Sequence, residues 1–237
     1  MRFYFIRHAQ SVNNALWDVD HYSKQRNEDP ELTEIGRQQA RMLASYIQRM
    51  DAEAGDRPLK RDAFGFTHVY CSLMVRAVET DLAVSEAAKV PLVAWPEIHE
   101  TGGIFLDDEE TGSQNGLPGK PRSYFINTYR GLALPETVTE EGWWNRPFEP
   151  DEARPLRAKH VYQELLARHG GTHDRVAIVS HGGFYMHLMR EIFTIEGGNI
   201  WFQMHNTAIT RVDFRPSGEA VLIYHNRTEH LPESLLT

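Results

Sequence analysis

The chain has 237 residues, of which 41% are hydrophobic, so it is long enough for one large α/β domain with a buried core. Its net charge of −8 argues against a general affinity for nucleic acid or anionic membranes, because such binding needs basic surface. The single cysteine, Cys71, excludes an intramolecular disulfide and a cysteine metal cluster, and it fits a reducing cytoplasmic location.

The first predicted element is a strand over residues 2–7, an aromatic and β-branched run that ends in Arg7 and His8. The run is too short for a signal-peptide core or a membrane span, so neither is expected. In an open α/β sheet, ligands bind at the carboxyl end of strands. A buried guanidinium and imidazole at that position predict an anionic ligand.

The next elements follow from apolar periodicity and from glycine and proline positions. In chain order we expect a polar segment to residue 31, a helix over 33–50 with Ile35 on its apolar face, a loop over 51–63, a strand over 67–72, a helix over 73–88 and a strand over 90–95.

Residues 102–150 are rich in glycine, proline and aromatic side chains, which is typical of a functional insertion in a compact domain. We therefore predict a cap over the sheet, with short helices. The paired Trp143 and Trp144 would either line the pocket or fix this cap to the core, and we favour the core. A helix over 151–169 returns the chain to the core, and Arg154 and Arg157 at its start are expected to form ordinary surface ion pairs.

The last predicted elements are a buried strand over 174–180, a helix over 183–194, and a hairpin of strands at 206–214 and 220–226. Strands that alternate with helices indicate a mostly parallel sheet. The predicted fold is a three-layer α/β sandwich with a cap insertion, formed as a single domain by residues 1–237. The hairpin would supply an edge strand for a homodimer, and a monomer is the alternative.

Polar and charged residues follow three of the predicted strands, where parallel strands bring them to one edge. The first strand ends in Arg7 and His8, the second is followed by Arg76, and the 174–180 strand is followed by His181 and Gly182. Guanidinium groups match phosphate oxygens, glycine N–H groups at a helix start approach an anion, and a neutral imidazole is a nucleophile. These residues predict phosphoryl transfer.

The sequence at these positions resembles the histidine phosphatase superfamily, the phosphoglycerate-mutase-like group, in a branch with Arg-His-Ala in place of Arg-His-Gly. The resemblance lies in four motifs in the family's order: RHAQSVNN at 7–14, LTEIGRQQA at 32–40, SLMVRAVET at 72–80 and VSHGG at 179–183. One departure is Gln10, where many members have glutamate, which would remove a charge from the pocket rim.

The resemblance implies a role for each matching residue. His8 would attack phosphorus and carry the phosphoryl group, while Arg7, Arg76 and His181 would hold its oxygens and stabilise the transition state. Asn14 and the backbone of Gly182 would add contacts to the phosphoryl group. Neither a metal nor a cofactor is implied, and Ser72 lacks the setting of a catalytic serine.

The general acid has two candidates, Glu97 and Glu100, both after the strand at 90–95. In the family the carboxylate precedes a glycine by a few residues, so we prefer Glu100, which lies nearer Gly102 and Gly103. This group would protonate the leaving oxygen and then activate water.

The leading hypothesis is a metal-independent phosphomonoesterase that forms a phosphohistidine on His8 and acts on a small phosphorylated substrate. Two alternatives stay open: a phosphoglycerate-type phosphomutase, and a catalytically weak phospho-ligand binding protein on the same fold. The presence of both histidines, both arginines and a carboxylate favours the enzyme. The substrate itself is not predicted, because specificity would lie in the cap.

Overall fold

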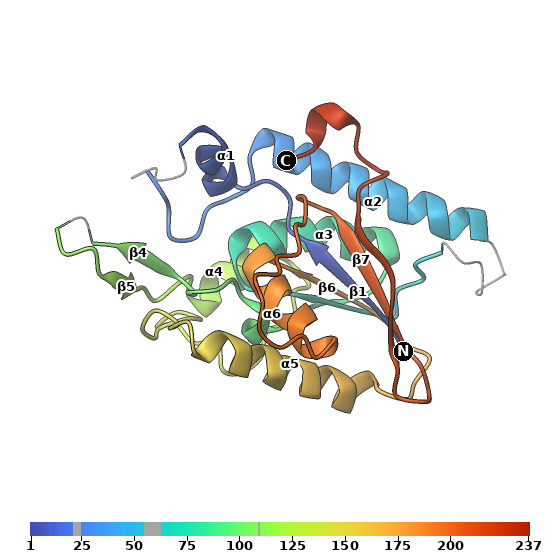
Figure 1. Ribbon diagram of the computed structural model, residues 1–237. Helices are drawn as coiled ribbons and strands as arrows, with labels where there is room; N and C mark the ends of the chain where they lie inside the picture. Colours follow the sequence, from blue (N-terminus) through green and yellow to red (C-terminus); the bar gives the residue numbers. More distant parts are fainter. Residues whose placement is uncertain (21–24, 55–62, 109) are drawn as a thin grey trace.

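The computed structural model describes residues 1–20, 25–54, 63–108 and 110–237 (Figure 1). Its elements in chain order are β1 Arg2–Arg7, α1 Val12–Val19, α2 Glu34–Ala54, β2 His68–Cys71, α3 Val75–Ala88, β3 Leu92–Ala94, the 3₁₀ turn η1 Pro96–Ile98, β4 Phe105–Asp107, β5 Gln114–Gly116, α4 Arg122–Thr128, α5 Ala153–His169, β6 Arg175–Ser180, α6 Gly182–Ile192, β7 Ile209–Phe214, β8 Ala220–Arg227 and the 3₁₀ turn η2 Glu233–Leu235.

The central sheet has the strand order β3-β2-β6-β1-β7-β8. The strands β3, β2, β6 and β1 are parallel neighbours, and β7 and β8 extend the sheet as an antiparallel hairpin. The prediction of an α/β fold with a mostly parallel sheet is confirmed. The predicted hairpin near the end of the chain is also confirmed.

The three layers follow from the alternation of side chains along β1. Tyr4 and Ile6 lie in one buried apolar cluster with residues of α2 and α3. Phe3 and Phe5 lie in a second cluster with residues of α5 and α6. Because successive strand residues point to opposite faces, a strand with apolar residues at every position is covered by helices on both sides. Figure 1 shows these two helix pairs on either side of the sheet.

Two expectations about the first third of the chain were wrong. The segment after His8 was expected to be an irregular polar stretch, but Val12–Val19 forms α1, which begins with a capping box between Ser11 and Asn14. Val12, Ala15, Leu16 and Val19 stand at the spacing of one helix face, a signal that could have predicted this helix, although none of its residues is buried. Ile35 was expected on the buried face of α2, but its side chain is 41% exposed.

The cap, residues 102–150, carries the small hairpin of β4 and β5 and the helix α4, which lie to one side of the central sheet (Figure 1). The backbone of Ala133 in this cap exchanges hydrogen bonds with Leu92 and Ala94 of β3, at 2.9 Å each. Trp143 and Trp144 are buried in the apolar cluster on the α2 and α3 face. The two tryptophans therefore fasten the cap to the core.

Within the part of the chain that the structure describes, no helix combines the length and the apolar character needed to cross a membrane.

Candidate active site

The carboxyl ends of β1, β6 and β2 lie side by side in the sheet. Arg7 pairs with Ser180 across β1 and β6, and Cys71 of β2 pairs with Val179 of β6. The residues that follow these strands, among them His8 and His181, are therefore neighbours although they are far apart in the sequence. This edge is where ligands bind in open α/β sheets.

His8 is almost completely buried, and its ring orientation is defined by the backbone. Nδ1 lies 2.7 Å from the carbonyl oxygen of Ala9, which only accepts hydrogen bonds, so Nδ1 carries the hydrogen. Nε2 therefore carries the lone pair of the ring, which accepts a hydrogen bond of 3.2 Å from Nε of Arg76. Burial, followed by the nearby Arg76 and Arg7 guanidinium groups, holds the pKa of His8 well below its ordinary range. The imidazole is therefore neutral and presents Nε2 as a nucleophile.

His181 lies beside His8, with 5.0 Å between the ring centroids. Its Nε2 is 2.9 Å from the hydroxyl of Ser72, the residue that follows β2. Burial lowers the pKa of His181, and the neighbouring Arg76 and His8 act in the same direction. Ser72 was not expected to have a role, whereas here its hydroxyl orients the second histidine.

Two guanidinium groups approach the histidines from different elements. Nη1 of Arg7 donates to the carbonyl oxygen of Met204 at 2.5 Å, and Arg76 projects from the first turn of α3. Sequence reasoning missed Asp29, a fully buried carboxyl that accepts a 2.9 Å hydrogen bond from the backbone N–H of Val75 and interacts electrostatically with Arg76. Burial raises the pKa of Asp29 to about 7, although Arg76 opposes the rise.

The carboxylate of Glu100 is held by backbone donors. Oε1 accepts from the N–H of Thr101 at 2.7 Å and of Phe184 at 2.9 Å, and Oε2 accepts from the N–H of Gly183 at 3.1 Å. The N-terminus of α6 was expected to bind a phosphate through Gly182 and Gly183, but the Gly183 N–H donates to this side chain. A carboxylate is favourable there because the helix dipole is positive at its N-terminus.

A pocket of about 220 Å³ opens beside His8. Four other predicted site residues contribute to its lining, namely Arg7, Asn14, Arg76 and Glu100. The lining also includes Asn13 and Trp17 of α1 and, beyond that helix, Asp20 and Arg26, none of which was predicted as a site residue.

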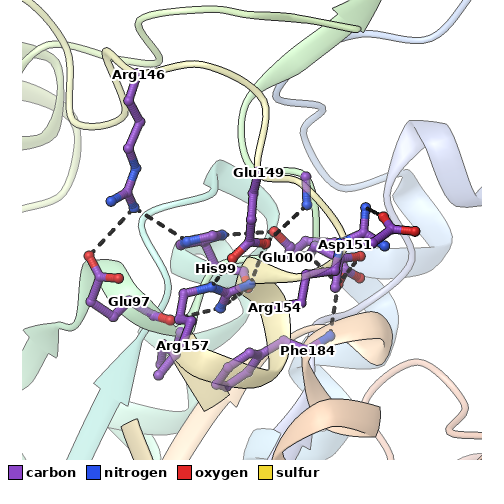
Figure 2. A network of polar contacts seen from close by, with 12 residues as sticks. Glu97, His99, Glu100, Arg146, Glu149, Asp151, Arg154, Arg157 and Phe184 are labelled. Atoms are coloured by element: carbon purple, nitrogen blue, oxygen red, sulfur yellow. Dashed lines mark hydrogen bonds and ion pairs between the residues drawn. The ribbon is translucent and has the colours of Figure 1, made fainter. Parts of the chain in front are cut away.

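Four residues near this edge do not line the pocket. His181 and Gly182 are not part of its lining, although the His181 ring is a neighbour of His8. Gln10 was expected at the rim, but it is buried and its side-chain oxygen accepts a 2.7 Å hydrogen bond from Thr33. Glu97 is a partner of Arg146, 3.4 Å away, as Figure 2 shows.

The expectation that Arg157 forms an ordinary surface pair was wrong. Its side chain is 7% exposed, and its guanidinium forms two hydrogen bonds with the equally buried carboxylate of Glu149, at 2.6 and 2.8 Å (Figure 2). The two residues are eight positions apart, at the end of the cap and in α5, a separation that no helical or strand periodicity relates.

One group of side chains in the described part of the chain has the composition of a metal site. It consists of His68, His169 and Asp174, whose ligand atoms lie within 4.8 Å of one another. His68 begins β2 and Asp174 precedes β6, so the group lies at the amino ends of the strands, opposite His8. Nδ1 of His169 is already 2.9 Å from Asp174, and its Nε2 is 3.0 Å from the hydroxyl of Tyr70. This group has no part in chemistry at His8.

The fold and the residues at its carboxyl edge define an α/β protein with paired buried histidines and arginines around a small pocket. The chain belongs to the histidine phosphatase superfamily (branch 1), whose model matches residues 3–110 and 130–227. The unmatched stretch, residues 111–129, lies within the cap and includes β5 and α4. A search of curated proteins found no match to the chain.

Several solved structures share the fold over nearly the whole chain. A phosphoserine phosphatase from Entamoeba histolytica in complex with 3-phosphoglyceric acid is 22% identical, covers 98% of this chain and 99% of its own, and has a TM-score of 0.60. A putative alpha-ribazole-5'-P phosphatase from Escherichia coli is 20% identical over 96% of each chain, with a TM-score of 0.61. A mycobacterial glucosyl-3-phosphoglycerate phosphatase is 19% identical over 96% of this chain and 99% of its own, with a TM-score of 0.55.

Proposed function

We propose that this protein is a metal-independent phosphomonoesterase that acts through a phosphohistidine on His8. The observation that carries the proposal is the orientation of this ring. The Nδ1–H group donates to the backbone of Ala9, so the lone pair of Nε2 lies beside Arg76, in a pocket that Arg7 and Glu100 also line. A neutral imidazole beside two cations is suited to attack a phosphate dianion.

The proposed reaction has two steps. The carboxylate of Glu100 would first take up a proton as the phosphate dianion binds beside it, since a neighbouring negative charge favours its neutral form. In the first step, Nε2 of His8 forms a bond to phosphorus while the ester P–O bond breaks, and Glu100 gives this proton to the leaving oxygen. In the second, the Glu100 carboxylate takes a proton from water, whose oxygen bonds to phosphorus as the N–P bond breaks. Inorganic phosphate is released, and Glu100 is again protonated. No metal or cofactor takes part in either step.

The charges around the pocket stabilise the transition state. Arg7 and Arg76 are placed to hold the equatorial oxygens of the transferring group, and such preorganised donors usually supply the largest part of the rate acceleration. We assign His181, whose ring Ser72 orients beside His8, as a further group that would contact these oxygens once the substrate is bound. We assign Asn14 and the backbone of Gly182 as further contacts.

The substrate class that fits best is a small phosphorylated metabolite. The pocket volume of about 220 Å³ accommodates a phosphate with a short organic group. The solved structures with this fold include phosphatases named for phosphoserine, alpha-ribazole phosphate and glucosyl-3-phosphoglycerate, which are small phosphate esters. We further propose that the protein is cytoplasmic, that it is a monomer or a homodimer, and that it has no nucleic-acid partner.

The proposal is tested by the hydrolysis of 4-nitrophenyl phosphate in excess chelator, with His8→Ala as the comparison. We expect activity that survives the chelator and is lost in His8→Ala, together with a phosphoenzyme that is labile in acid and stable in base. Equal activity in both proteins would remove His8 as the nucleophile. Phosphate binding without turnover would favour the phospho-ligand binding protein, and transfer to an added phosphoglycerate instead of water would favour the mutase.

A further inference from the structure

The ion pair of Arg157 and Glu149 joins the general-acid segment to the rest of the molecule. Its geometry is bidentate, and neither side chain is more than 7% exposed. A buried charge pair of this kind is a poor source of stability, because removing both charges from water offsets most of their attraction. Its place in the fold indicates another use.

Arg157 holds the backbone that leads into Glu100. Its Nη1 donates to the carbonyl oxygen of Glu97 at 2.8 Å and of His99 at 3.0 Å. Its guanidinium carbon also lies 4.7 Å from the ring centroid of Phe184, the residue whose N–H binds the Glu100 carboxylate. Figure 2 shows these contacts converging on Arg157 from η1, the cap and α6.

Glu149 holds the other end of the same segment. Its carboxylate accepts from the N–H of Gly102 at 3.3 Å, and its own N–H donates to the carbonyl oxygen of Gly102 at 3.0 Å. Residues 97–102 are therefore restrained at both ends by one buried ion pair, with Glu100 between them. Since Gly102 and Glu149 lie near the two ends of the cap, the ion pair also ties the cap to the acid.

We propose that Arg157 and Glu149 are positioning residues that hold Glu100 in place for proton transfer to the leaving group. This inference rests on the proposed function, in which Glu100 is the general acid. Proton transfer needs the donor within hydrogen-bond distance of the leaving oxygen, so a loosened segment lowers the rate for those esters that need a proton.

The test compares two substrates that differ in this need. Phenyl phosphate releases a basic oxygen that requires a proton, whereas 4-nitrophenyl phosphate releases a stable anion. The parameter is kcat/KM, because it reports the step in which the leaving group departs and does not depend on the later attack of water. We expect Arg157→Lys and Glu149→Gln to lower kcat/KM for phenyl phosphate by about 10- to 100-fold, and for 4-nitrophenyl phosphate by less than about 3-fold.

The matched control is Arg154→Lys. Arg154 lies on the same helix, and its partner at 2.7 Å is the exposed Asp151, so we expect both substrates to keep their wild-type kcat/KM. Glu100→Gln should show the same selectivity as Arg157→Lys, and the double variant should lose little more than Glu100→Gln alone, because both act through one group.

The outcomes separate the two proposals. If Glu100→Gln lowers kcat/KM equally for both substrates, Glu100 is not the general acid, and the proposed function loses that step. If Glu100→Gln lowers kcat/KM mainly for phenyl phosphate, but Arg157→Lys and Glu149→Gln lower kcat/KM equally for both substrates, only the positioning role is overturned. Glu149→Gln keeps the shape of the side chain, so it remains informative if Arg157→Lys proves unstable in thermal melts.

Discussion

Replacing Gly183 by alanine should displace the proposed general acid without changing any residue that would carry the chemistry. A Cβ atom at this position would lie 2.5 Å from Oε1 of Glu100 and 2.6 Å from the hydroxyl of Thr101. Contacts below 3.0 Å force one partner to move, and the carboxylate is the part that is free to do so. Glu100 would then leave the two N–H groups of α6.

The size of the effect follows from those hydrogen bonds. A hydrogen bond to a charged group contributes about 1.5–3 kcal/mol. If one such bond is lost in positioning Glu100, the rate falls by about 10- to 150-fold, since about 1.4 kcal/mol corresponds to a factor of ten. We expect this decrease in kcat/KM for phenyl phosphate with Gly183→Ala.

The neighbouring glycine provides the comparison. A Cβ atom on Gly182 would meet nothing closer than 3.7 Å, where it would touch Nε of Arg7, and alanine keeps the backbone N–H. Gly182→Ala should stay within about 3-fold of the wild-type rate, and its melting temperature should hold or rise, since alanine is preferred over glycine in a helix by up to about 1 kcal/mol. Wild-type activity in Gly183→Ala, with the protein folded, would refute the reasoning.

Three further changes have expected outcomes. Because burial raises the pKa of Asp29 to about 7 from 3.8, the folded protein keeps a proton that the unfolded chain loses, so the wild-type free energy of unfolding should fall as pH rises across that window. Over this pH range the wild-type free energy of unfolding should change by at most about 4 kcal/mol. In Asp29→Asn this change should be absent, as measured by urea unfolding at the low and the high end of the range. Ser72→Ala removes the hydrogen bond to His181 and should lower kcat/KM by about 2- to 10-fold at an unchanged melting temperature, and a melting temperature that falls in step with the rate would contradict this. Trp144→Ala should reduce stability by about 3–5 kcal/mol, measured by denaturant unfolding, because the ring is buried between the cap and the core.

The fold and much of the site were predictable because they depend on local patterns. The run from Phe3 to Ile6 has an apolar residue at every position, which indicates a strand covered on both faces, and β1 is such a strand. Residues placed after the ends of parallel strands meet by topology alone, so the sequence was sufficient to predict that His8 and His181 lie together.

Other features depend on contacts that no periodicity encodes. Arg157 is buried because the chain turns back and presents Glu149 to it, and a charged residue near the start of a helix is otherwise expected to be exposed. A sequence pattern identifies the Gly183 N–H as a donor, but it does not identify the acceptor. Phosphate was therefore the expected acceptor, whereas in the structure it is the Glu100 carboxylate.

The strand order also determines when the protein can assemble during synthesis. The two neighbours of β1 are β6 and β7, so the strand that leads to His8 has no partner until residues 175–180 have left the ribosome. Within the central sheet only β2 and β3 can pair earlier, since β6 also lies between β1 and β2. A nascent chain of about 170 residues therefore holds an unpaired apolar strand, and such species depend on chaperones to escape aggregation. All the residues that line the pocket lie within the first 100 positions, but the central sheet that holds β1 beside β2 is completed only by β6, so the active site would assemble only once the polypeptide is nearly finished.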